Sequence, residues 1–129
     1  MAETDEVRLA VPASPEFLRL ARVTAAGLAS RIGFSFDEVE DLRLAIDELC
    51  YGLTGSGGRD GTVEMRYLIG ADRLVVEGEG HFSTDGAPLA LSELSEVILR
   101  ALVDEHELTE GPIGPAFRLV KQRHGAPNR

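Results

Sequence analysis

The stretch from Ser35 to Gly55, SFDEVEDLRLAIDELCYGLTG, carries the clearest helix signal in the chain. Ser35 and Glu38 have the spacing of a capping box, in which each side chain accepts a hydrogen bond from the other residue's backbone N–H. Apolar residues then recur every three or four positions, at Val39, Leu42, Ile46, Leu49 and Leu53. This period predicts a helix that buries one stripe, and we expect the other elements to pack around it.

A second strip of the same helix is placed to carry function. Asp41, Leu44, Glu48 and Gly52 follow one another at helical spacing, away from the middle of the apolar stripe. The strip combines two carboxylates with a glycine, so a site is expected there rather than more core.

Composition limits the classes of partner. The chain has 129 residues, enough for one domain with its own core. With 22 acidic against 13 basic side chains and a net charge of -9, it repels nucleic acid and anionic membranes. No segment approaches the ~20 apolar residues of a membrane span. The single cysteine and the lack of a signal-peptide pattern favour a cytoplasmic protein.

The sequence predicts a single domain over residues 7–122. Residues 1–6 are expected to form a mobile N-terminal tail and residues 123–129 a mobile C-terminal tail. There is no internal repeat and no low-complexity segment.

The N-terminal part of the domain predicts a strand followed by a helix. Apolar residues alternate over residues 7–11, and Pro12 ends the pattern. Ser14 followed by Pro15 is typical of a helix start, and Gly33 suits the left-handed position that ends a helix.

The C-terminal part predicts a hairpin, then a helix and two more strands, the last of which is expected to pair with one of the earlier strands. The strands are expected at 62–69, 73–77, 107–109 and 116–122. Gly78 and Gly80 interrupt the second of these patterns, so we expect the strand to end before them. Ser92 can cap a third helix. Its predicted buried stripe consists of Leu94, Val97, Ile98, Ala101 and Leu102.

This order of elements predicts the fold class. A β, α, α, β, β, α, β, β order fits an α+β fold, a two-layer sandwich with a mostly antiparallel sheet of about five strands and three helices on one face.

Three segments also resemble a known family. They are DELCYG of the second helix, VEGEG at the end of a strand, and ILRALVDEHEL of the third helix. With the element order, they resemble the GHKL (Bergerat-fold) ATP-binding domain, most closely the anti-sigma-factor serine kinases of bacterial partner-switching systems. The resemblance runs from Val7 to Gln122.

The family's first motif is Glu-x-x-x-Asn, whose Glu acts as general base and whose Asn holds Mg²⁺. Glu48 matches the Glu, but Gly52 stands at the Asn position. Phosphoryl transfer depends on positioning and on neutralisation of phosphate charge by the metal, so the loss of that ligand affects the mechanism itself.

The family's second motif is Asp-x-Gly-x-Gly, whose Asp recognises the adenine amino group. Gly78 and Gly80 match its glycines, but Val76 stands at the Asp position, and its side chain accepts no hydrogen bond. Glu77 would replace the Asp only if the strand slipped by one residue, which would reverse its two faces.

The third motif is a glycine-rich lid and helix start where backbone N–H groups meet phosphate. Alignment on residues 100–102 places Glu93 and Ser95 at its glycines. A carboxylate there opposes a triphosphate.

Simpler readings stand beside these. Glu48 on a solvated helix face needs no catalytic role, and Gly78 and Gly80 suit a turn. Cys50 is expected to be a small core residue. The three histidines, His81, His106 and His124, show no metal-ligand spacing with cysteine or with each other, so no metal site is expected.

Two functions remain open. In the first, the chain is a regulator that binds proteins and has lost ATP binding. Its partners would be a sigma factor, an anti-anti-sigma protein or a second copy of itself, and no cofactor is expected. In the second, it is an active serine kinase that uses Glu48, ATP and Mg²⁺. The residues at the altered positions, Gly52, Val76, Glu93 and Ser95, favour the first.

Overall fold

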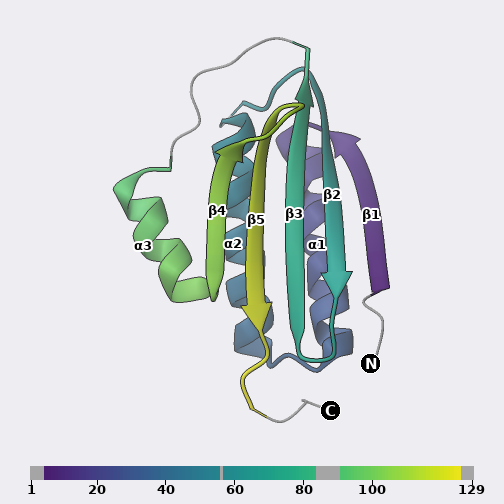
Figure 1. Ribbon diagram of the computed structural model, residues 1–129, viewed down its shortest axis with the longest axis vertical. Coiled ribbons are helices and arrows are strands. Elements are labelled where there is room, and N and C mark those ends of the chain that lie inside the picture. Colours follow the sequence, from purple (N-terminus) through teal and green to yellow (C-terminus); the bar gives the residue numbers. More distant parts are fainter. Residues whose placement is uncertain (1–4, 56, 84–90, 126–129) are drawn as a thin grey trace.

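A five-stranded antiparallel sheet with helices packed on one side forms the body of the molecule (Figure 1). The computed structural model describes residues 5–55, 57–83 and 91–125. The elements are β1 (Asp5–Pro12), α1 (Pro15–Ile32), α2 (Phe36–Thr54), β2 (Gly61–Ile69), β3 (Arg73–Phe82), α3 (Glu93–Leu102), β4 (Glu105–Glu110) and β5 (Pro115–Gln122). The predicted element order and α+β class are confirmed.

The strands lie in the order β1-β2-β3-β5-β4, and all neighbours are antiparallel. The β2–β3 and β4–β5 pairs are hairpins, with β5 inserted between β3 and β4. In Figure 1, α1 lies behind β1–β3 and α2 behind β5, while α3 stands beyond the β4 edge. The core therefore lies between the sheet and the pair α1–α2.

The helix signals of α2 are confirmed. Glu38 N–H donates to Ser35 Oγ at 3.2 Å, and Ser35 N–H donates to Glu38 Oε1 at 2.8 Å, which completes the capping box. The predicted stripe is buried at Leu42, Ile46, Leu49 and Leu53. This buried face makes α2 the central helix of the domain.

The predicted bounds of α1 are also correct. Gly33 ends the helix with φ at 94°, in the left-handed region. Ser14 occupies the cap position without a side-chain cap bond, and its carbonyl accepts the Phe17 and Leu18 N–H groups instead. Tyr67 of β2 donates a buried 2.8 Å hydrogen bond to the Ala21 carbonyl, which joins the sheet to α1.

The prediction that β3 ends before Gly78 is wrong. The strand continues to Phe82, and both glycines stay in register with β2. A Cβ atom at Gly78 would lie 2.7 Å from Cζ of Phe117, and one at Gly80 would overlap the Phe82 ring. These glycines make room for aromatic rings, so they do not turn the chain.

The predicted buried stripe of α3 is wrong at three positions. Only Leu99 is fully buried in this helix, whereas Leu94 and Val97 are 68% and 58% exposed and Ala101 is exposed as well. Because α3 stands at the sheet edge beside α2 and β4, only one side of it meets the core (Figure 1).

The predicted tail boundaries shift by a few residues. β1 begins at Asp5, inside the predicted N-terminal tail. At the other end, Arg123 Nη1 donates to the Ile32 carbonyl at 2.9 Å, and His124 N–H donates to Glu38 Oε2 at 2.8 Å. Residues 1–4 and 126–129 of the predicted tails lie outside the described residues. Among the helices described, none is long and apolar enough to cross a membrane.

Candidate functional site

The first turn of α3 meets the middle of α2 at Glu48. Ser95 Oγ donates to Glu48 Oε2 at 2.8 Å. Ser95 N–H in turn donates to Ser92 Oγ at 3.0 Å, because Ser92 caps α3. Two family-matched positions, Glu48 and Ser95, are therefore brought together, and the half-buried Glu48 carboxylate is occupied by a hydrogen bond within the chain.

The next turn of α2 is covered by leucines. A Cβ atom at Gly52 would lie 3.2 Å from Cδ2 of Leu91 and 3.2 Å from Cδ2 of Leu108. An asparagine side chain fits there only if these leucines move. Gly52 thus lacks a metal ligand and also the room for one.

A buried lysine contacts Asp41, at the N-terminal end of the α2 strip that also contains Leu44, Glu48 and Gly52. Lys121 Nζ donates to the Leu102 carbonyl at 2.6 Å and lies 3.7 Å from Asp41 Oδ2, with its side chain 8% exposed. The cation sits at the C-terminal end of α3, where helix carbonyls favour positive charge. Lys121 was missed in the sequence. Its signal was the inward face of the last strand, which it shares with Phe117 and Leu119.

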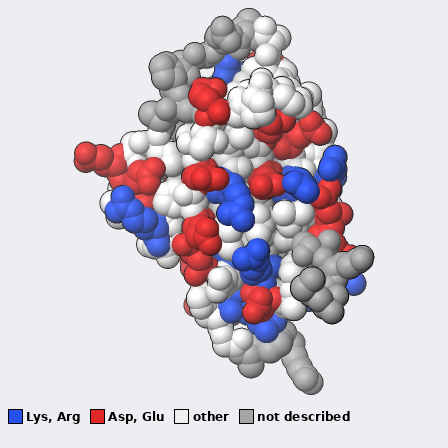
Figure 2. Space-filling model, viewed as in Figure 1, with Lys and Arg blue, Asp and Glu red and all other residues white. Residues whose placement is uncertain are grey.

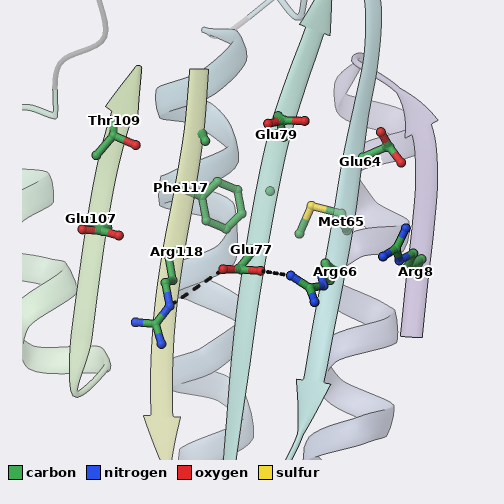
Figure 3. A pocket seen from close by; sticks show the side chains of 12 residues that line it. Arg8, Glu64, Met65, Arg66, Glu77, Glu79, Glu107, Thr109, Phe117 and Arg118 are labelled. Atoms are coloured by element: carbon green, nitrogen blue, oxygen red, sulfur yellow. Dashed lines mark hydrogen bonds and ion pairs between the residues drawn. The ribbon is translucent and has the colours of Figure 1, made fainter. Parts of the chain in front are cut away.

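The second motif is divided between the two faces of the sheet. Val76 is fully buried against the helices. Glu77 points to the opposite face, where its carboxylate lies 3.2 Å from Arg66 Nη1 and 3.8 Å from Arg118 Nε (Figure 3). Because the strand keeps its register, Glu77 does not take the place of the family's Asp.

The outer face of the sheet has a hollow of about 380 Å³ (Figure 3). Ion pairs link side chains of all five strands across it, in the order Glu6, Arg66, Glu77, Arg118 and Glu105. Hydrogen bonds from Arg8 and Arg66 lower the pKa of Glu6. Figure 2 shows both signs of charge mixed over this face. Such exposed pairs contribute little stability each.

Cys50 lies in the core, as predicted. It is 4% exposed and lines the base of a groove of about 230 Å³ between α1 and α2. Burial, with a smaller effect from the Asp47 carboxylate, raises the pKa of the Cys50 thiol to about 12. The thiol is therefore protonated at neutral pH and is a poor nucleophile.

Comparison with known proteins points to one group of relatives. No family model matches the chain. It is 39% identical over 82 residues to serine-protein kinase RsbW of Bacillus pumilus. The matched segment covers 59% of this chain and 51% of that protein. The chain is a homologue of the RsbW serine-protein kinases.

Other relatives carry the same name. The RsbW kinase of Bacillus subtilis is 37% identical over 81 residues, covering 59% of this chain and 51% of that protein. That of Listeria monocytogenes is 40% identical over 78 residues, covering 56% and 48%. The chain thus spans about half the length of the RsbW proteins that it matches.

Proposed function

We propose that this protein is an anti-sigma-factor-like regulator of a bacterial partner-switching system, which acts in the cytoplasm by binding proteins and has lost ATP binding. The observation that carries the proposal is the 2.8 Å hydrogen bond from Ser95 Oγ to Glu48 Oε2. In the family that the sequence resembles, this glutamate is the general base. Here it is already held by the first turn of α3.

The surrounding residues support the same proposal. Gly52 offers no side-chain oxygen for Mg²⁺ and is covered by Leu91 and Leu108. Ser92 Oγ accepts one of the first N–H groups of α3, that of Ser95, and Glu93 adds a carboxylate to the same end of the helix. A helix start binds phosphate through free N–H groups and a positive field, and both are reduced here.

The exposed face of α3 supports a role in protein binding. Leu94 and Val97 are largely exposed on this helix, where the sequence predicted burial. They lie one helical turn apart, and neighbouring exposed apolar side chains are typical of protein-binding surfaces. The proposed partners are a sigma factor, an anti-anti-sigma protein or a second copy of the chain.

An active serine kinase is the alternative. Its support is the name of the relatives and the retention of Glu48. For this function α3 would have to release Glu48, and Mg²⁺ would need a ligand other than residue 52.

Isothermal titration with Mg²⁺-ATP separates the two functions. We expect no binding in the micromolar range. A clear isotherm with a Kd below ~100 µM, equivalent to about 5.5 kcal/mol, would overturn the loss of ATP binding. The Bacillus subtilis RsbW kinase in the same titration provides a comparison.

A pull-down from the native host, with mass identification of the bound protein, tests the partner class. We expect Leu94→Asp and Val97→Asp each to abolish binding of the partner protein in the pull-down, because each places a charge on the exposed face of α3. Ile113→Asp is the matched control, since Ile113 is 69% exposed in the β4–β5 turn. Capture that survives both α3 variants would exclude this helix as the binding surface.

A further inference from the structure

We propose that Glu64, Glu79 and His81 form a binding site for a divalent transition-metal ion of the Zn²⁺ class on the outer face of the sheet. One potential ligand atom from each side chain lies within 4.8 Å of the others. The site is separate from the α2 strip and does not depend on the proposed regulatory function.

The backbone fixes the relative positions of the three side chains. Glu64 on β2 pairs directly with Glu79 on β3, and His81 follows two residues later on the same face of β3. Both strands have hydrogen-bonded neighbours on each side. The ligand set therefore stands on a rigid hairpin inside the sheet, which favours a defined geometry.

The electrostatics of the cluster favour a cation. Two carboxylates directly opposite one another on neighbouring strands repel. In the structure the His81 imidazole lies between them, with Nε2 2.7 Å from Glu79 Oε1 and 3.4 Å from Glu64 Oε2. A divalent ion bound by all three groups would neutralise both carboxylates at once.

The distances suit a transition metal. Zinc binds imidazole nitrogen and carboxylate oxygen at about 2.0–2.2 Å, which places tetrahedral ligands roughly 3.4 Å apart. The distance from His81 Nε2 to Glu64 Oε2 already has this value. The distance from His81 Nε2 to Glu79 Oε1, now 2.7 Å, would have to lengthen by less than about 1 Å, which a small side-chain rotation allows. A water molecule would supply the fourth ligand. A nitrogen ligand favours Zn²⁺ over Mg²⁺ and Ca²⁺, which prefer oxygen.

The cluster is open to solvent. The Glu64 side chain is 50% exposed, and the other two are about one third exposed. Glu64 and Glu79 also line the hollow, where Figure 3 shows both on neighbouring strands. Spacing among histidines and cysteine does not reveal this site, because two of its ligands are glutamates and one comes from the other strand of the hairpin.

Titration of the full chain with ZnCl₂ tests the site. We expect one Zn²⁺ per chain, and a Kd at least tenfold weaker in His81→Ala and in the double variant Glu64→Gln, Glu79→Gln. His124→Ala is the matched histidine control and Glu107→Gln the matched carboxylate control. Both should bind as the parent chain does, and a tenfold excess of Mg²⁺ should not displace the ion.

A second readout does not depend on any substitution. The ring ¹⁵N resonances of His81 should shift on addition of one equivalent of Zn²⁺, while those of His124 should stay in place. The proposal is overturned if the parent chain binds no stoichiometric Zn²⁺, if the His81 and glutamate variants retain full affinity, or if His124→Ala loses as much affinity as His81→Ala.

Discussion

Ser95 Oγ donates a hydrogen bond of 2.8 Å to Glu48 Oε2, which joins the first turn of α3 to the middle of α2. Polar contacts are important for the position of α3, because Leu99 is its one fully buried residue. Another such contact joins Glu96 of this helix to His106 Nε2 of β4, at 2.8 Å. The Ser95 hydroxyl thus occupies one of the two oxygens of the Glu48 carboxylate.

Removal of the hydroxyl should destabilise the domain. We expect Ser95→Ala to lower the free energy of unfolding by about 1 kcal/mol, because it leaves a half-buried carboxylate without this donor. Urea denaturation measures the change. Glu48→Gln should cost less, since an amide oxygen still accepts the hydroxyl.

A double-mutant cycle isolates this bond from other effects of the substitutions. Ser95→Ala combined with Glu48→Ala should show a coupling energy of about 0.5–1.5 kcal/mol. Ser30→Ala, at an exposed position of α1, gives the same change of residue type away from Glu48. A coupling near zero would mean that the contact does not hold α3 in solution.

Glu38 should make the stability of the domain depend on pH. Burial alone would raise its pKa, but hydrogen bonds from the backbones of His124 and Ser35 outweigh this and hold it below the ordinary value of 4.5. A lowered folded-state pKa means that the stabilisation is complete above pH 4.5 and is lost as the pH falls through the folded-state value.

Replacement of this carboxylate tests the linkage. Glu38→Gln should cost about 1 kcal/mol of unfolding free energy at pH 7, because one amide oxygen replaces the two carboxylate oxygens that accept from Ser35 and His124 N–H. The difference from the parent chain should shrink below about pH 4. Asp37→Asn is the control, because Asp37 is in the same turn but exposed. A cost for Glu38→Gln that is constant from pH 7 to pH 3 would contradict the assignment.

Two glycines offer opposite outcomes for the same substitution. Gly78→Ala should lower the free energy of unfolding by about 1–3 kcal/mol, because the new Cβ would overlap the Phe117 ring. Gly27→Ala should raise it by up to about 1 kcal/mol, because nothing lies within 4 Å and alanine favours the helix. Thermal or urea unfolding of both variants measures the contrast.

The Phe117 ring is the proposed cause of the Gly78 effect. Gly78→Ala combined with Phe117→Leu should therefore cost less than the sum of the two single substitutions. Strictly additive costs would show that the loss has another origin, such as the backbone of β3.

The sequence predicted best the features that depend on nearby residues. The capping box of Ser35 and Glu38 and the buried stripe of α2 need only one helical segment, and both are present. The extension of β3 was not predicted, because the role of Gly78 is set by Phe117, a residue on another strand far along the chain. Local turn chemistry does not contain that information.

The site shows the same limit. Apolar periodicity identified a face on α3, but it did not show that this helix stands at the sheet edge, so Leu94 and Val97 were wrongly placed in the core. The motif comparison selected Glu48 and Ser95 separately. Only the packing of α3 against α2 shows that their side chains are joined.

Gly52→Asn puts back the residue type that holds Mg²⁺ in the family, but we do not expect it to restore nucleotide binding. The first atom of the new side chain would lie 3.2 Å from Leu91 and Leu108, so we expect a loss of about 1–3 kcal/mol of unfolding free energy from overpacking. We also expect no Mg²⁺-ATP binding and no ATP hydrolysis, because Val76, Glu93 and Ser95 remain. Gly52→Ala, which adds only the Cβ atom, is the control for stability and should stay within about 1 kcal/mol of the parent chain. ATP binding or hydrolysis by Gly52→Asn alone would show that α3 yields readily to nucleotide, and that a single lost ligand separates this chain from an active kinase.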